Sequence, residues 1–228
     1  MFNAQSFGTT DPQFGLDNGF YVFVLPGLKL VLAAVAMLLG VGLVFSVVTH
    51  VLMGGIRITM PVNGRGLFSI TKRCRRQLGI WLMLNMFAWA VRQMIGVFDQ
   101  LTVQGSRITG ASYTAVHANI PVTFIMAVLT AILGVVLGIW LMRSHTLEGQ
   151  ASIGVRASAA LKAWRVPVTS IAVVVVVGLV LTVAWPVLLQ RFRVNPNAQE
   201  MESTYIQRNI DATRAAYGLS LIHISEPT

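Results

Sequence analysis

Three long stretches of this sequence contain no Asp, Glu, Lys or Arg: residues 30–56, 108–142 and 166–190. Crossing roughly 30 Å of hydrocarbon at 1.5 Å per residue takes about 20 apolar residues, so each stretch can span a membrane. The valine-rich residues 171–181 would suggest a strand in a soluble protein. A strand over residues 166–190, however, would be on the order of 80 Å long, and its unpaired backbone groups would be costly in lipid. The sequence therefore predicts an all-α fold, a polytopic transmembrane helical bundle.

The apolar pattern predicts a transmembrane domain over residues 28–189. Its four predicted spans are residues 28–48, 78–98, 121–142 and 167–189. The composition agrees, because 11% of the residues are charged, whereas a soluble domain carries about 25%. A proline stands just before or at the start of three spans, where its missing N–H costs nothing: Pro26, Pro121 and Pro167.

Lys and Arg are unevenly distributed among the segments outside the spans. Segments 50–76 and 143–166 hold ten of them, whereas 1–27 and 99–120 hold one. An excess of Lys and Arg marks the cytoplasmic side of a membrane. We therefore expect a multi-pass protein of the plasma membrane, with both ends of this chain extracytoplasmic. The same placement explains the net charge of +9 without a nucleic-acid partner.

Residues 190–219 follow the last span and are predicted to begin an extracytoplasmic region. Asn197 and Glu200 have the spacing of a capping box at a helix start. Gly218 could end that helix. Apolar or small side chains recur at helical spacing between them: Ile206, Ile210, Thr213 and Tyr217. The pattern predicts a short amphipathic helix whose stripe needs a partner, either the bilayer surface or protein outside this chain.

Three stretches carry a resemblance to a known family: residues 7–23 (FGTTDPQFGLDNGFYVF), 110–118 (GASYTAVHA) and 186–219 (PVLLQRFRVNPNAQEMESTYIQRNIDATRAAYGL). Together they resemble uncharacterised protein family 0182, a bacterial family of large membrane proteins. The resemblance implies further helices upstream, a large extracytoplasmic region downstream, and the remainder of its own chain as a partner. An acid usually follows GASYT in this family, but Ala115 stands there. The resemblance implies no activity and no catalytic residues.

The last nine residues, 220–228 (SLIHISEPT), do not fit the resemblance. They resemble a translated sequencing-adaptor read-through. We hypothesise that this tail is not native and that this chain is an internal fragment.

Polar residues in the second span are the candidate functional groups. Arg92 stands within that span, and an intramembrane ionisable group is costly and often functional. It lies two turns from Asp99, however, and could snorkel outward and pair with that acid. Asn85 is a further polar candidate in this span, which also contains Gln93.

Two further groups of residues have structural interpretations. Small residues at helical spacing in the third span favour close helix packing: Ala127, Ala131, Gly134 and Gly138. A run of cations before the second span fixes topology and could also bind anionic lipid head groups: Lys72, Arg73, Arg75 and Arg76.

The sequence predicts no catalytic residues, cofactor or metal. The four histidines have no metal-ligand spacing, and no phosphate-binding motif is present. The favoured hypothesis is a non-enzymatic membrane module that anchors an extracytoplasmic region. The alternative is a transporter or channel component, because such proteins place polar groups near the midplane. The one partner implied besides the rest of the chain is the lipid bilayer.

Overall fold

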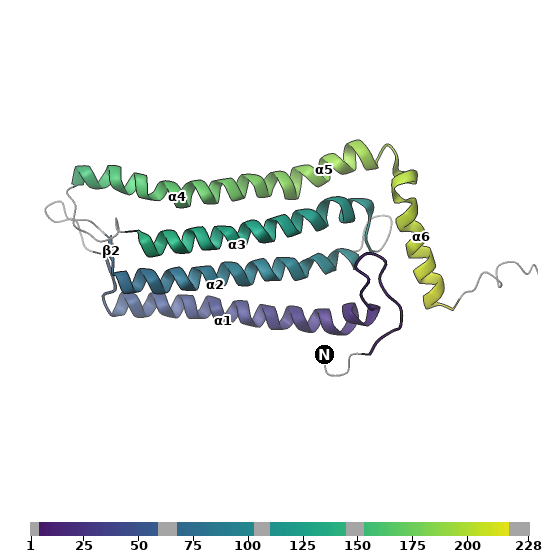
Figure 1. The fold of residues 1–228 in the computed structure, drawn as a ribbon, viewed down its shortest axis with the longest axis horizontal. Helices are drawn as coiled ribbons and strands as arrows, with labels where there is room; N and C mark the ends of the chain where they lie inside the picture. The colour runs from purple at the N-terminus through teal and green to yellow at the C-terminus, as the bar shows by residue number, and fades with distance from the viewer. Residues whose placement is uncertain (1–4, 59–67, 103–109, 145–152, 219–228) are drawn as a thin grey trace, which may run out of the picture. The chain divides into compact units, whose positions relative to one another are not determined.

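The computed structural model describes residues 5–58, 68–102, 110–144 and 153–218 (Figure 1). Four helical segments are long and apolar enough to cross a membrane: Phe20–Leu52, Lys72–Leu101, Ala115–Arg143 and Arg165–Val194. The predicted all-α polytopic fold is confirmed. The chain divides into two compact units. The first is Met1–Met94 with Met126–Val177, and the second is Ile95–Ile125 with Gly178–Thr228.

The elements follow one another in a simple order. The first half of the chain contains η1 (Phe20–Val24), α1 (Leu25–Leu52), β1 (Ile56–Ile58), β2 (Phe68–Ile70), α2 (Lys72–Gly96) and η2 (Val97–Leu101). The second half contains η3 (Ala115–Asn119), α3 (Ile120–Arg143), α4 (Ile153–Leu179), η5 (Val180–Ala184), α5 (Trp185–Leu189), η6 (Gln190–Val194) and α6 (Ala198–Ala216). The η segments are short π- or 3₁₀-helical turns that continue the neighbouring α-helices.

Each helix extends beyond the span predicted for it, and the fourth differs most. A helix start at Pro167 was expected, but α4 begins at Ile153 and contains Pro167 in its interior. Proline in a helix removes one backbone hydrogen bond. In the turn that contains Pro167, the hydroxyl groups of Thr169 and Ser170 donate to the carbonyl oxygens of Arg165 and Pro167, at 2.6 and 3.0 Å.

Pro186 likewise does not end the fourth helix. The π-helical turn η5 precedes it, and the Trp185 N–H donates five residues back, to the carbonyl oxygen of Val180. A π turn changes the hydrogen-bond spacing of the helix locally, so the chain continues past Pro186 through α5 and η6 to Val194.

A short hairpin, which was not predicted from the sequence, stands between α1 and α2. Strands β1 and β2 pair antiparallel, with Ile56 opposite Ile70. Ile70 packs with Cys74 and Leu78 of α2 in a small buried cluster, and the partly buried Leu43 of α1 packs against this cluster. The hairpin therefore continues directly into the packed start of α2.

Glycines let α2 approach both α1 and α3 closely. A methyl group added at Gly42 of α1 would overlap the Trp81 ring of α2. Methyl groups added at Gly134 and Gly138 of α3 would overlap the side chains of Met86 and Met83, respectively. Helix association in lipid depends on such close packing, because lipid tails are as apolar as the side chains.

Much of the remaining apolar surface is exposed. Leu30, Met37 and Leu38 of α1 are 72%, 71% and 70% exposed. A soluble protein rarely exposes a continuous apolar surface of this extent. For a transmembrane helix, the same surface is the one that lipid covers.

Helix α6 differs in one detail from its sequence prediction. Asn197 is its N-cap residue as expected, but its side chain makes no capping hydrogen bond, so the predicted capping box was wrong. Gly218 follows the helix with a positive φ of 65°, as expected for a C-terminal glycine. The apolar stripe is largely open: Ile206, Ile210 and Tyr217 are 38%, 39% and 77% exposed.

We expect Gly138→Ala to lower the Tm of the purified chain in detergent. The added methyl group would press on Met83 and on the carbonyl oxygen of Gly79, 2.9 Å away, and such overpacking costs about 1–3 kcal/mol. Gly96→Ala is the matched control, because nothing lies within 4 Å of its added methyl group. Equal Tm values for the two variants, measured by thermal size-exclusion chromatography, would contradict this account of α2–α3 packing.

Candidate functional site

Asn85, one of the predicted polar sites, serves helix packing. Its side-chain amide donates to the carbonyl oxygen of Leu39 in α1 at 3.2 Å and to that of Trp81 at 2.9 Å. The first bond joins α1 to α2. The hydrogen-bond donors of Asn85 are therefore directed at the protein backbone.

Gln93 makes a similar link on another side of α2. Its side-chain amide donates to the hydroxyl group of Thr130 in α3 at 3.1 Å, and Thr130 in turn donates to the carbonyl oxygen of Met126. Thr130 is buried. A buried polar group needs such partners, because leaving it unbonded is costly.

The charged residues of the first two spans differ in exposure. Arg92 is exposed on α2, whereas Asp99 is half-buried in η2. Lys29 is exposed in α1. Lys29 was not predicted as a site, although it falls within the predicted span 28–48 and inside the helical segment Phe20–Leu52. A charge count over each span would have found it.

The four cations at the start of α2 have two different environments. Lys72, Arg73 and Arg76 are exposed. Arg75 is fully buried, and its guanidinium group donates to the carbonyl oxygen of Ser144 beyond α3. Arg75 thus links two helix ends, which differs from the surface position that its place in the run suggested.

The small-residue positions of α3 lie where close packing requires them. Ala127, Gly134 and Gly138 are buried, and Ala131 is half-buried. The two glycines are those that meet Met86 and Met83 of α2.

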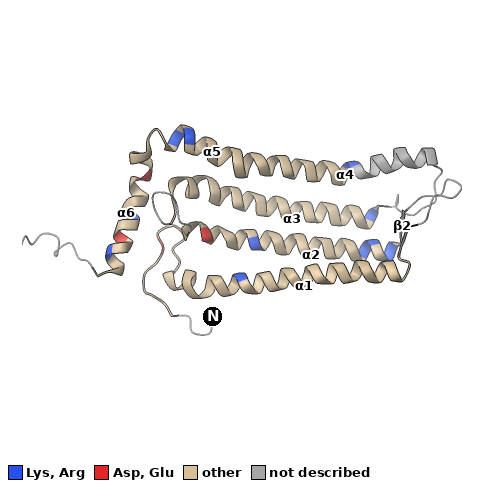
Figure 2. Ribbon diagram, turned by 180° about the vertical axis from the view of Figure 1, so that it is seen from behind, with Lys and Arg blue, Asp and Glu red and all other residues tan. Residues whose placement is uncertain are grey.

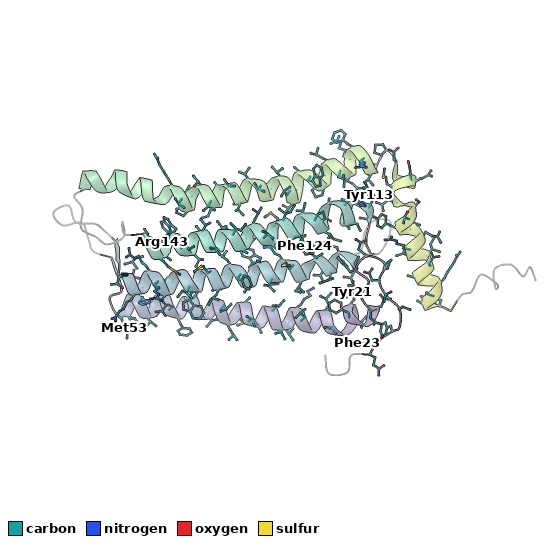
Figure 3. All side chains as sticks on the ribbon, in the orientation of Figure 1. Tyr21, Phe23, Met53, Tyr113, Phe124 and Arg143 are labelled. Atoms are coloured by element: carbon teal, nitrogen blue, oxygen red, sulfur yellow. The ribbon has the colours of Figure 1, made fainter. Side chains whose placement is uncertain are left out.

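The second unit holds a cluster of polar and aromatic side chains that we call the α6 dock: Tyr113, which Figure 3 labels, with His117, Arg193, Glu202 and Tyr205. The rings of Tyr113 and His117 stack at 4.1 Å between centroids. The ring of Tyr205 meets Tyr113 edge-on at 6.3 Å. Its hydroxyl group lies 3.5 Å from His117 Nδ1. The guanidinium group of Arg193 lies 6.0 Å from the centre of the Tyr113 ring.

Hydrogen bonds reinforce these ring contacts. The Tyr113 N–H donates to the carboxylate of Glu202 at 3.3 Å, and Glu202 is buried. Thr114 donates to the side-chain oxygen of Gln190 in η6. Burial raises the pKa of the Tyr205 phenol, although Arg208 acts in the opposite direction. The neutral phenol is therefore retained in the dock.

Local helical spacing positions the dock residues. Tyr113 and His117 are four residues apart around the start of η3, so their rings lie on one face. Glu202 and Tyr205 are three apart on α6 and share a face for the same reason. Glu202 and Tyr205 of α6 thus both reach Tyr113, whereas Ile206, Ile210 and Tyr217 of the same helix remain exposed.

The N-terminal segment folds around two carboxylates. Asp17 accepts hydrogen bonds from the Ser6 hydroxyl group at 2.5 Å and from the N–H groups of Phe7 and Gly19. These bonds, that of Ser6 first, lower the pKa of Asp17. The second carboxylate, Asp11, accepts from the Tyr21 hydroxyl group at 3.2 Å. These hydrogen bonds fix the conformation of the segment that leads into the first helix.

Within the four described ranges of the chain, no three His, Cys, Asp or Glu residues come together as a metal site. The hypothesis on residues 220–228 concerns residues outside those ranges.

Comparison with known proteins shows which family the chain belongs to. A family model described as "Uncharacterised protein family (UPF0182)" matches residues 1–228. The chain belongs to this family. No solved structure matches it. Two of the three stretches that carried the family resemblance, 110–118 and 186–219, supply all five residues of the α6 dock.

Three relatives illustrate the similarity. A UPF0182 protein of Bifidobacterium adolescentis is 77% identical over 97% of this chain. UPF0182 proteins of Corynebacterium glutamicum and Kocuria rhizophila are 35% and 37% identical, each over 96% of the chain. In all three, the match covers 20% of the relative. The chain therefore corresponds to one fifth of the length of these UPF0182 proteins.

We expect Tyr205→Ala to raise amide hydrogen exchange throughout α6 by roughly two- to twelvefold, because an aromatic pair contributes about 0.5–1.5 kcal/mol beyond burial. Thr204→Ala is the matched control: Thr204 is the exposed neighbour of Tyr205 on the same helix. Exchange mass spectrometry of the detergent-solubilised chain measures both. If α6 exchanges equally fast in the two variants, the dock does not hold it.

Proposed function

We propose that this chain is a membrane-embedded module that anchors and orients an extracytoplasmic region of a longer protein. The observation that carries the proposal is the α6 dock. The fourth helix ends at Val194, and α6 begins at Ala198. Contacts of Glu202 and Tyr205 with Tyr113 then hold α6 beside the start of the third helix.

The direction of the chain after the last span is therefore set by side-chain contacts. A flexible linker would leave whatever follows free to reorient. A docked helix instead ties the next part of the chain to the outer ends of the third and fourth helices. This is what a module that positions an outer region requires.

The open stripe of α6 supports the same proposal. Ile206, Ile210 and Tyr217 form an exposed apolar face next to the face that meets the dock. The relatives are about five times as long as the matched region, since the match covers 20% of each. We propose that further parts of such a longer protein pack on this stripe.

We propose a plasma-membrane location in which α6 lies outside and the start of α2 lies inside. The uneven distribution of Lys and Arg supports this orientation. The described acids agree with it, because all of them belong to the segments assigned to the outer side: Asp11, Asp17, Asp99, Glu200, Glu202 and Asp211.

The proposal assigns the chain no catalysis and no transport. The transport alternative rested on the polar residues of the second span. Asn85 and Gln93, however, donate to partners in α1, α2 and α3, which supports a packing role. Arg92 is exposed on α2, where a long side chain can reach toward the membrane surface.

We expect Ile206→Asp, in the longer protein, to speed the release of the outer region by trypsin added to intact cells. The new carboxylate would disrupt packing on the stripe and expose the nearby cleavage sites Arg208 and Arg214. Thr204→Asp is the control, because it adds the same charge to the opposite face of α6. Immunoblotting of the released fragment measures the rate. Equal release from the two variants would show that the stripe is not covered in this way.

Cysteine labelling tests the orientation separately. Cys74 is fully buried and is first replaced by Ser. A single new cysteine is then introduced at an exposed position, as Tyr217→Cys in one variant and as Arg76→Cys in another. We expect a membrane-impermeant maleimide to label the first on intact cells and the second after permeabilisation. The reverse pattern would invert the proposed topology.

A further inference from the structure

Four exposed cations gather where α2 begins and α3 ends. We call them the basic surface: Lys72, Arg73, Arg76 and Arg143. Two contacts place these helix ends together. The buried Arg75 donates to the carbonyl oxygen of Ser144, and a methyl group added at Gly79 would lie 2.9 Å from Met142 Cγ. Figure 2 shows the blue positions at these two helix ends.

The protein supplies no nearby acid to this surface within the described part of the first unit. The acids described there, Asp11 and Asp17, both precede α1, whereas the basic surface lies beyond the other end of that helix. Asp17 is moreover bonded to the N-terminal turn. The cations at the start of α2 also lie at the positive end of the dipole of this helix. This position is unfavourable for a cation without an external anion.

Apolar side chains border the basic surface. Leu52 and Met53, at the end of α1, are each 81% exposed, and Ile80, two turns into α2, is 42% exposed. A hydrogen bond between His50 Nε2 and Gln77 Oε1, 3.0 Å apart, joins the end of α1 to α2 in this region. A ligand that matches this surface must therefore carry negative charge next to a hydrocarbon group. A soluble anion or a nucleic acid carries the negative charge but has no hydrocarbon group.

We propose that the basic surface binds the phosphate head groups of anionic phospholipids, with the acyl chains against the adjoining apolar side chains. The guanidinium and ammonium groups are phosphate donors, and each cation near an anionic leaflet contributes to binding. Arg75 is excluded from this role because it is buried and bonded to Ser144. The proposal goes beyond anchoring and holds for either orientation of the chain.

The test uses the purified chain in neutral detergent, titrated with dansyl-labelled phosphatidylglycerol and detected by energy transfer from tryptophan. The double variant Arg73→Gln/Arg76→Gln should bind about 25-fold more weakly, at about fivefold for each cation removed. Lys29→Gln/Arg92→Gln is the matched control, since it removes two exposed cations of the first unit that lie away from the start of α2. It should change the affinity less than about twofold, because neither cation borders the proposed site.

Equal losses in the two variants, or none in either, would overturn the proposal, because binding would then depend on net charge or on hydrocarbon alone. A variant that fails to fold is recognised by its Tm. In that case the wild-type chain decides: raising the salt concentration must weaken binding of phosphatidylglycerol and leave binding of dansyl-labelled phosphatidylcholine unchanged. Binding of the two lipids with the same affinity and salt dependence would also overturn it.

Discussion

The constraint on which this structure depends is that hydrocarbon provides no hydrogen-bond partners for the backbone. Long apolar segments must therefore be helical, even the valine-rich residues 171–181 that would favour a strand in water. The same constraint explains how the prolines are accommodated. Around Pro167, hydroxyl groups bind carbonyl oxygens, and before Pro186 a π turn shifts the hydrogen-bond pattern. In both places the helix continues through the proline.

Lipid also changes what holds the helices together. Burial of apolar surface gives little preference for helix contact over lipid contact, and α1 accordingly leaves residues such as Met37 exposed. Specific contacts therefore hold the helices together. Glycines of α3 pack against methionines of α2, and side-chain amides donate hydrogen bonds from one helix to another. Asn85 and Gln93 belong to this second group. Their bonds explain why polar residues in the second span need not mark a path for a substrate.

The fold class and the four helices could be predicted from the sequence because the length of an apolar run is a direct physical requirement of the bilayer. The helix ends could not, since α4 and η6 continue into polar residues whose helicity depends on local contacts. The environment of α6 was predicted only in part. The pattern identified the apolar stripe, but a single sequence does not reveal that the adjoining face, with Glu202 and Tyr205, contacts Tyr113 about 90 residues earlier.

The run of residues 72–76 shows how helical geometry separates residues that look equivalent in sequence. Successive positions on a helix turn by about 100°, with 3.6 residues per turn. Arg75 therefore lies in the buried sector of α2 with Cys74 and Leu78, while the other cations of the run are exposed. Burial of Arg75 is tolerable because its guanidinium group meets the Ser144 carbonyl; an arginine without such a partner would be costly there. One short basic run thus joins two helices through one residue and leaves its other cations exposed.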